Sequence, residues 1–396
     1  MTRIDDPVGF IGSAVVMHLP IPFIIAARPP TLVRLLVFAS QFQLAIWGNS
    51  TFIIGDTFQT YALGCLFYAW PLFTALHFCF LTDALEDGTR HVHDKEAAKD
   101  MPLAKRVWWA TCLVATFRGI GWSTQVPHVR EVPKTQSRRS FIVERLCYAA
   151  LYIFWADLVG LYVTHNPITS SRAAEKFPVT SEGLLFQAFN VTAWWGNVWS
   201  GFAALYELLA AGSVAFGLWE PRFWPPMFGS WWDAYTVRRT WGRVWHHILR
   251  RFIMSIGKAT ARFCGAQPGT NASSYIQLYM GFLVSGLLHA WGDRQLDRSF
   301  GRSPSFFMAQ AVAITVEDGV VALGKRLGVR ESPVTRTLGR VWTYAWFVVS
   351  TPLLLQVITG HGRPLDPTLP VSPVTAMWKA AGMEGRMSIP WPEPHA

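Results

Sequence analysis

A single histidine, His289, lies near the end of a long apolar run, Leu278 to Asp293, which reads LYMGFLVSGLLHAWGD. A titratable side chain in such a run must offset the cost of leaving water. Gly281 and Ser285 precede it at intervals of four residues, so on a helix all three share one face. Two small residues let a neighbouring helix or a ligand approach the imidazole, as in the wall of a channel. The alternative is a packed histidine bonded to a neighbouring carbonyl.

A second segment, VRRTWGRVWHHILRRF, extends upstream from Val237 to Phe252. Helical spacing puts its apolar side chains, Trp241 and Trp245 among them, on one face; the other face carries Arg239, Arg243, His246 and Arg250. The segment is too charged to cross a bilayer. We therefore predict an interfacial helix, with its tryptophans in the lipid boundary and its guanidinium groups facing water or an anionic ligand. A helix that merely lies on acidic lipid is the alternative.

Together these stretches resemble the membrane-bound O-acyltransferase superfamily, and within it the wax synthase-like branch. That branch has a WPPLFG-like stretch, a charged helix with an FWGRRWHQ-type core and a later SGLxH helix, in this order. The corresponding stretches here are WPPMFG at 224–229, TWGRVWHH at 240–247 and SGLLH at 285–289. RGIGW at 118–122 and GRVW at 339–342 are also similar to that branch. The resemblance covers the chain from residue 118 to residue 358.

The resemblance implies an acyl-CoA-dependent O-acyltransferase embedded in the endoplasmic reticulum. Chains of this compact size with these motifs look like the fungal members that acetylate hydroxyl groups of terpenoid and meroterpenoid secondary metabolites. This implies acetyl-CoA as co-substrate, with no permanently bound cofactor. The expected partners are acyl-CoA, a hydrophobic alcohol and membrane lipid. Long-chain ester formation on fatty alcohols or sterols is the alternative within the class.

Acyl transfer from a thioester to an alcohol needs a base for the hydroxyl proton and donors that stabilise the oxyanion. Histidine suits the first role, because it titrates near neutrality and burial disfavours its charged form. In the family the histidine of the SGLxH helix is the base, so the resemblance puts this role on His289. His246 stands where related acyltransferases carry an Asn or His, and is expected to assist or to position the thioester. Asp293, one turn beyond His289, either orients its ring or lies past a helix end at Gly292.

Coenzyme A carries several phosphate charges, which makes the basic segment the expected acyl-CoA site. Its predicted members are Arg239, Arg243, Arg250, Arg251, Trp241 and Trp245. No GxSxG elbow accompanies the histidines, which favours direct transfer over a covalent acyl-enzyme. The sequence also shows no convincing metal-ligand spacing, since the His91 and His93 pair lies in a charged loop.

Composition places the chain in a membrane. Of its 396 residues 51% are hydrophobic and only 15% are charged, and 20 tryptophans suit interfacial belts. The net charge of +10 comes from loops between apolar runs, which favours orientation signals and anionic head groups over nucleic acid.

We expect an all-α polytopic protein that forms a single domain over residues 1–396, in which 219–358 carry the charged helix and the histidine helix. Eight spans are predicted, at 8–27, 31–46, 59–81, 141–163, 190–218, 271–291, 304–324 and 341–358. Loops 83–140, 219–270 and 325–340 hold 23 of the 35 Lys and Arg, which predicts that these loops are cytosolic and both termini lumenal.

Acidic residues within the predicted spans, Asp157, Glu317 and Asp318, are costly in lipid and should face the bundle interior. Hydrogen bonds between helices are one explanation. The rival, from another functional class, is a non-catalytic transporter in which His289, Asp157 and Glu317 form a proton or substrate path. Asn49 and Asn190 match the glycosylation acceptor pattern close to the membrane.

Overall fold

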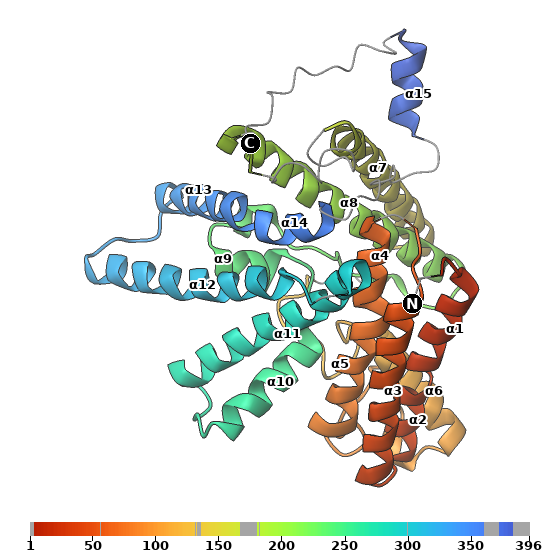
Figure 1. Ribbon diagram of the computed structural model, residues 1–396. Helices are drawn as coiled ribbons and strands as arrows, with labels where there is room; N and C mark the ends of the chain where they lie inside the picture. Colours follow the sequence, from red (N-terminus) through yellow and green to blue (C-terminus); the bar gives the residue numbers. More distant parts are fainter. Residues whose placement is uncertain are drawn as a thin grey trace. The chain divides into compact units, whose positions relative to one another are not determined.

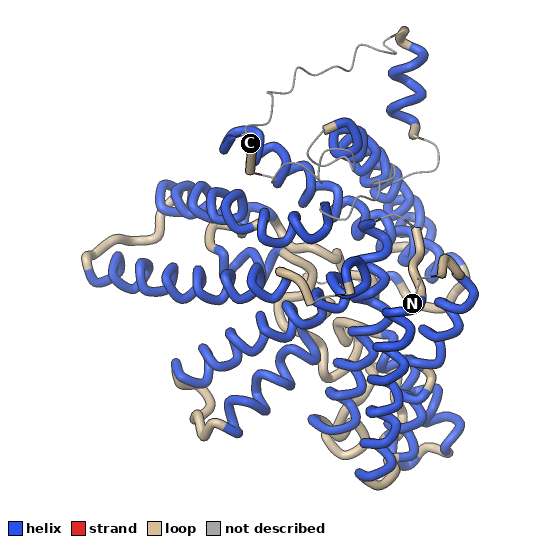
Figure 2. The backbone as a smooth tube through the Cα atoms, viewed as in Figure 1, coloured by secondary structure: helices blue, strands red, loops and turns tan. Residues whose placement is uncertain are grey.

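The computed structural model describes residues 4–55, 57–130, 132, 136–166, 180–181, 183–298, 300–359 and 372–382. These residues form helices joined by loops, and no strand occurs among them apart from isolated bridges (Figure 2). The predicted all-α class is confirmed. The chain divides into two units, which are described separately: unit 1 comprises Met1–His128 with His246–Gly328, and unit 2 comprises Val129–Trp245 with Val329–Ala396.

Unit 1 carries both histidine positions singled out by the sequence. Its longer α-helices are α1 (Pro7–His18), α2 (Pro20–Ala27), α3 (Thr31–Thr51), α4 (Thr57–Leu63), α5 (Trp70–Leu76), α6 (Leu103–Ala115), α10 (Arg250–Phe263), α11 (Asn271–Asp297) and α12 (Ser303–Arg326) (Figure 1). Wider π turns, η1 (Gly64–Ala69) and η2 (His77–Leu81), continue α4 and α5, and a short 3₁₀ turn, η3 (Ala98–Asp100), precedes α6.

Local signals explain where two of these helices begin. The Asp6 carboxylate accepts hydrogen bonds from the Val8 and Gly9 amides, and Pro7 opens α1 at a position that needs no N–H donor. The Thr270 hydroxyl accepts from the Ser273 amide at 3.2 Å and caps α11. Each cap satisfies amides that the first helical turn leaves without a partner.

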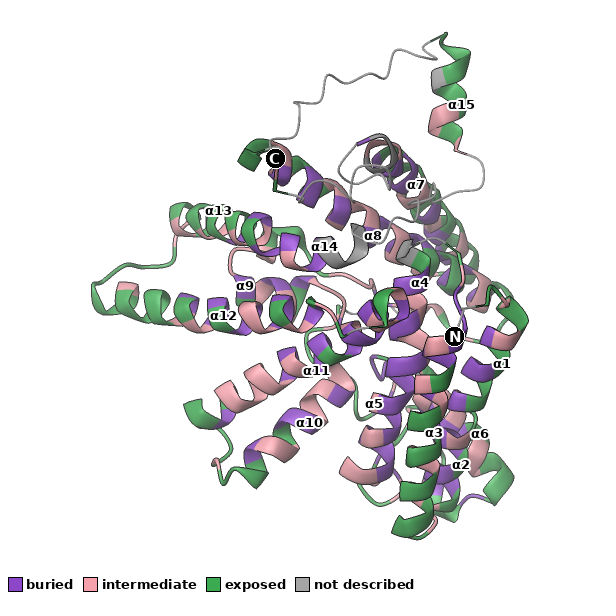
Figure 3. Cartoon of the chain, in the orientation of Figure 1, coloured by how far each residue is buried: buried purple, intermediate pink, exposed green. Residues whose placement is uncertain are grey.

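The core of unit 1 lies between α2, α5, η2 and α6, where Ile21, Ile24, Phe78, Trp109 and Leu113 are buried (Figure 3). Helix α11 packs on α10 and α12 and also against α4 and η1. Many of its side chains are buried around its middle and second half. The helix is thus held on several sides, which fixes the direction of its polar groups.

Unit 2 is built around two long helices, α7 (Arg138–His165) and α8 (Gly183–Ala215), which pack along each other. Arg145 and Glu207 form a buried ion pair between them, with Nη1 and Oε2 3.1 Å apart. The unit also contains η4 (Pro221–Phe223), η5 (Trp231–Asp233), α9 (Val237–Arg239), η6 (Thr240–Val244), α13 (Pro333–Ser350), α14 (Pro352–Thr359) and α15 (Pro373–Ala380). The predicted region 219–358 therefore draws on both units.

Five helical stretches among the described residues are long and apolar enough to cross a membrane: Pro7–Ala27, Thr31–Thr51, Gln59–Leu81, Gly183–Ala215 and Ser303–Arg326. Each coincides with a predicted span. The other three predictions fall on α7, α11 and α13 with α14, which are helical but do not meet the same measure of length, hydropathy and charge. The chain is an all-α, integral membrane protein, and the exact number of crossings stays a prediction.

Asp157 and Asp318 have polar partners on other helices. The Asp157 carboxylate accepts from the Val374 amide at 2.8 Å, and Asp318 accepts from the Tyr275 hydroxyl at 3.0 Å. Asn49 and Asn190 are also buried, and the Asn49 amide nitrogen donates to the Trp291 carbonyl at 3.0 Å. Glycans are bulky and lie at protein surfaces, so the burial of both asparagines is unfavourable for glycosylation.

Candidate active site

His289 lies on α11, a continuous helix of 27 residues, and shares a face with Gly281 and Ser285 as predicted. Both small residues are buried, and a Cβ added at Gly281 would come within 2.9 Å of the Ile253 side chain of α10. The neighbour that the small residues admit is therefore α10. The His289 imidazole itself is half-buried.

Two aromatic rings hold the His289 imidazole in place. Its Nδ1 atom lies 2.9 Å from the Tyr61 hydroxyl of α4, and the two rings stack with centroids 5.8 Å apart. Phe307 of α12 stacks on the same imidazole at 4.6 Å, and the Cys65 sulfur is 3.9 Å from Nδ1. A hydroxyl group from another helix thus contacts Nδ1, whereas the alternative interpretation expected a neighbouring carbonyl.

The hydroxyl of Tyr61 begins a chain of polar groups that ends at Asp293. Tyr61 lies 3.1 Å from Oγ of Ser303, and this Oγ donates to Oδ1 of Asp293 at 2.7 Å. The Ser303 amide donates to the second carboxylate oxygen, Oδ2, at 3.0 Å. Tyr61, Ser303 and Asp293 are all buried. The helix continues through Gly292, so Asp293 reaches His289 through two intervening hydroxyls rather than lying beyond a helix end.

A glycine makes this close packing possible. A Cβ at Gly292 would lie 2.7 Å from both the Cys65 sulfur and the Tyr61 ring. Any side chain there would therefore push α4 and η1 away from α11. Sequence reasoning did not find Tyr61 or Ser303, because each is distant from His289 along the chain and has no local motif that marks it.

His246 belongs to the same unit as His289 and lies in the loop that precedes α10. Burial, with smaller contributions from positive charge on His289, His247 and Arg118, lowers the pKa of His246 to about 3. The two predicted catalytic histidines therefore lie within electrostatic range of one another. At neutral pH His246 is uncharged, so it can exchange hydrogen bonds with a thioester but offers no charge to a phosphate.

The segment 237–252 does not form the single interfacial helix that was predicted. Helix α9 passes into the π turn η6, which ends at Val244, and Trp245 has extended backbone angles of φ −68° and ψ 155°. The Val244 carbonyl accepts a hydrogen bond from the Gly229 amide at 2.9 Å. A Cβ at Gly229 would lie 2.0 Å from the Arg243 carbonyl, so only glycine permits this approach. The WPPMFG loop thus ends the helix at Val244, and a new one, α10, begins at Arg250.

The basic residues consequently do not share one helical face. Arg239 donates to the Asp233 carboxylate at 2.7 Å and lies over the Tyr235 ring, whereas the Arg243 side chain is exposed. Arg250 is half-buried in unit 1. Arg251 donates to the carbonyls of Leu113 and Thr116 at 2.7 and 2.6 Å, which ties α10 to the end of α6. Of these arginines, Arg243 presents the most accessible guanidinium group.

Trp241 and Trp245 pack in an aromatic cluster of unit 2. Trp245 lies 5.0 Å from Trp195 and 5.3 Å from Phe228, and Trp241 lies 5.8 Å from Phe347, measured between ring centroids. Both tryptophans are half-buried. They are packed against other side chains of unit 2, and the interfacial position predicted for them rested on a helix that does not form.

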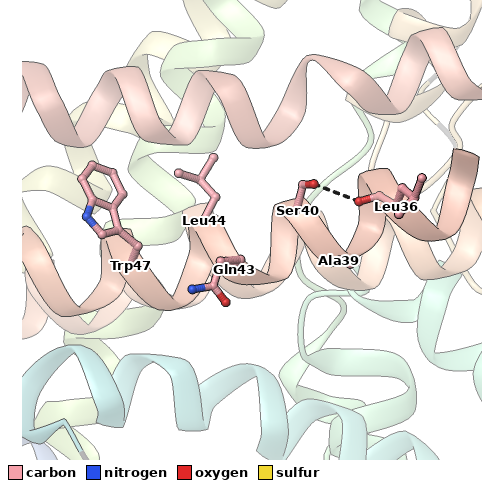
Figure 4. A pocket seen from close by; sticks show the side chains of 6 residues that line it. All are labelled: Leu36, Ala39, Ser40, Gln43, Leu44 and Trp47. Atoms are coloured by element: carbon pink, nitrogen blue, oxygen red, sulfur yellow. Dashed lines mark hydrogen bonds between the residues drawn. The ribbon is translucent and has the colours of Figure 1, made fainter.

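A separate groove lies along α3 and is lined by Leu36, Ala39, Ser40, Gln43, Leu44 and Trp47 (Figure 4). Its polar groups are an amide and a hydroxyl, and the Ser40 hydroxyl donates to the Leu36 carbonyl within the helix. With no titratable side chain in its lining, the groove offers no acid or base for acyl transfer. Among the described residues, no group of three or more His, Cys, Asp or Glu could hold a metal ion.

Comparisons with known proteins agree with the family that the motifs indicated. The family described as "Membrane bound O-acyl transferase family" matches residues 224–309, which include both His246 and His289. The chain is 37% identical over 297 residues to "Acetyltransferase ple2" of Rhodocybe pseudopiperita, covering 73% of this chain and 76% of that protein. It is 31% identical to "Acetyltransferase eriL" of Hericium erinaceus, over 66% of this chain and 69% of that one. It is 29% identical to "O-Mevalon transferase yanI" of Aspergillus niger, over 64% and 62%.

Proposed function

Because this chain belongs to the membrane bound O-acyl transferase family, we propose that it moves an acetyl group from acetyl-CoA to a hydroxyl of a terpenoid or meroterpenoid. The chain is an acyltransferase that uses an acyl donor as co-substrate and works in a membrane. The small donor and the terpenoid acceptor are the specific parts of the proposal. Relatives named as acetyltransferases support the acetyl group.

The observation that carries the proposed mechanism is the placement of His289. Its ring is fixed by Tyr61 and Phe307, with Nδ1 engaged by the Tyr61 hydroxyl. We assign to His289 the role of general base. As the acceptor oxygen attacks the thioester carbonyl, the imidazole takes the hydroxyl proton. The new C–O bond forms, the C–S bond breaks, and the proton passes from the imidazolium to the departing CoA thiolate.

His246 is the proposed second histidine of the site. Being neutral, it can hydrogen-bond to the thioester or its oxyanion without repelling the imidazolium that forms on His289. Arg239, Arg243 and Arg250, with Trp241 and Trp245, remain the proposed acyl-CoA contacts. Arg243 is the strongest of these, because its side chain is exposed. We place the enzyme in the endoplasmic reticulum, where membrane lipid and a hydrophobic alcohol are both at hand.

Donor selection tests the proposal. Membranes that contain the protein are incubated with radiolabelled acetyl-CoA or palmitoyl-CoA and a panel of terpenoid, fatty and sterol alcohols. Membranes that carry the His289→Ala protein serve as the control for endogenous transferases. We expect labelled acetyl esters on terpenoid alcohols. Exclusive use of palmitoyl-CoA would reject the acetyl donor and favour a long-chain ester synthase.

A further inference from the structure

The hydrogen bonds that join His289 to Asp293 through Tyr61 and Ser303 have a defined direction. An ionised carboxylate has no proton to donate, and a serine hydroxyl has only one. Asp293 accepts from Ser303 through both carboxylate oxygens, at 2.7 Å from Oγ and 3.0 Å from the amide. The hydroxyl proton of Ser303 is therefore committed to Asp293.

The direction then passes to the histidine. Ser303 Oγ has given its proton away, so across the 3.1 Å contact with Tyr61 it accepts, and the Tyr61 hydroxyl donates. The Tyr61 oxygen is left with lone pairs facing Nδ1 of His289 at 2.9 Å, so this contact requires a proton on Nδ1. The reverse direction would set lone pairs of Ser303 and Asp293 against each other at 2.7 Å.

We infer that Asp293, Ser303 and Tyr61 are positioning residues that hold His289 in the tautomer with its proton on Nδ1, so that Nε2 carries the lone pair of the base. This inference rests on the proposed role of His289 in acyl transfer. The chain draws its residues from α4, α11 and α12. In other sites a single buried carboxylate fixes a histidine tautomer by direct contact. Here the carboxylate acts on the histidine through two hydroxyl groups.

An Asp293→Asn variant should reverse the direction of the hydrogen bonds between residue 293 and His289. The side chain itself changes little in shape. The Ser303 amide can only donate, so the new side-chain oxygen must face it, and the new NH₂ group must face Ser303 Oγ. Ser303 must then donate to Tyr61, and Tyr61 to Nδ1. The proton of His289 moves to Nε2, and the base is lost. In a serine protease the comparable carboxylate-to-amide change lowers turnover about ten-thousandfold.

Two further variants distinguish an effect of hydrogen-bond direction from an effect of side-chain packing. In Ser303→Ala the Tyr61 hydroxyl loses its acceptor and turns its proton to Nδ1, which favours the wrong tautomer. In Tyr61→Phe/Ser303→Ala the hydroxyl that faces Nδ1 is gone and only the weak Cys65 thiol donor remains, 3.9 Å away, so both tautomers are populated. We expect turnover of the double variant to be about tenfold higher than that of Ser303→Ala. Simple loss of contacts would instead make the second substitution lower turnover further. If the residues only fill space, the double variant will be the slower of the two.

The direct test is ¹⁵N NMR of histidine-labelled protein in detergent, with the His289 signals assigned by their loss in His289→Ala. In the native protein we expect His289 to carry its proton on Nδ1 and none on Nε2. In Asp293→Asn we expect the opposite. A protonated Nε2 in the native protein, or no change in Asp293→Asn, would overturn the inference. This readout needs no substrate, so it stands even if acetyl transfer is disproved.

Kinetics provide the second readout. Asp293→Asn should lower kcat about a hundredfold to ten-thousandfold while KM for acyl-CoA stays nearly constant, because the proton acceptor and not the donor site is altered. The matched control is Tyr279→Phe, which removes a hydroxyl that pairs with Thr315 at 3.2 Å between the same helices, α11 and α12. Equal losses of kcat in the control and in Tyr61→Phe would show that the hydrogen bonds from His289 to Asp293 only hold the helices together.

Discussion

The two segments that the sequence singled out differ in how far local pattern determined them. Residues 271–297 form one helix, with the expected face and the expected small residues against a neighbour. Residues 237–252, with an equally regular pattern, break after Val244. The difference lies in the backbone: the Val244 carbonyl bonds to Gly229, a residue outside the segment. Periodicity predicts a helix only where no other part of the chain captures its carbonyls.

The comparison also separates two kinds of proposed functional residue. His289 is held by groups from α4 and α12, with a rigid helix beneath it. Arg239, Arg243 and the tryptophans lie on short turns, where Asp233 and an aromatic cluster already engage most of them. A rigid helix suits a base that must be placed accurately, whereas an exposed side chain such as Arg243 suits a mobile, charged ligand.

The largest effect is expected at the rigid segment. His289→Ala removes the proposed proton acceptor, so acyl transfer should fall by about a hundredfold to ten-thousandfold while the protein stays folded. Turnover is measured in detergent beside a size-exclusion profile that reports folding. Retention of more than about a tenth of native turnover would exclude the general-base role.

The next effect concerns the loop that ends the second segment. Gly229→Ala places a Cβ 2.0 Å from the Arg243 carbonyl, so we expect the free energy of unfolding to fall by roughly 1–3 kcal/mol. The measurement is the temperature of thermal unfolding, which should be lower than in the native protein. Gly242→Ala is the matched control on η6, because a Cβ there meets nothing within 4 Å. If both variants unfold at the same temperature, the close approach of Gly229 does not hold the break in place.

The smallest effect tests the exposed cation. Arg243→Glu should raise KM for acyl-CoA about three- to tenfold, the size of one or two exposed charge contacts, and leave KM for the alcohol unchanged. Added salt should shrink the difference, because exposed charges are screened over roughly 8–10 Å. The measurement uses a neutral detergent, which removes acidic lipid.

Arg139→Glu is the control for this charge reversal, because Arg139 is an exposed arginine of the same unit outside the charged segment. A donor KM that is unchanged in Arg243→Glu, or raised equally in both variants, would reject Arg243 as a phosphate contact. Lipid anchoring would then be the better account of the basic residues.

The sequence by itself determined the helical class, five stretches able to cross a membrane, and the face on which His289 lies, because these depend on hydropathy and on the helical repeat. The ordered motifs also determined the family. The predicted single domain over 1–396 stays a prediction beside the two units of the structure.

Only the tertiary structure decided which groups surround the histidine. Tyr61 reaches His289 across 228 positions of the chain, and Asp293 reaches it through Ser303 of a different helix. No periodicity within a segment encodes such contacts, because they form where separate helices meet at glycines such as Gly292. The break at Val244 has the same origin, a backbone bond between distant residues that competes with the local helix.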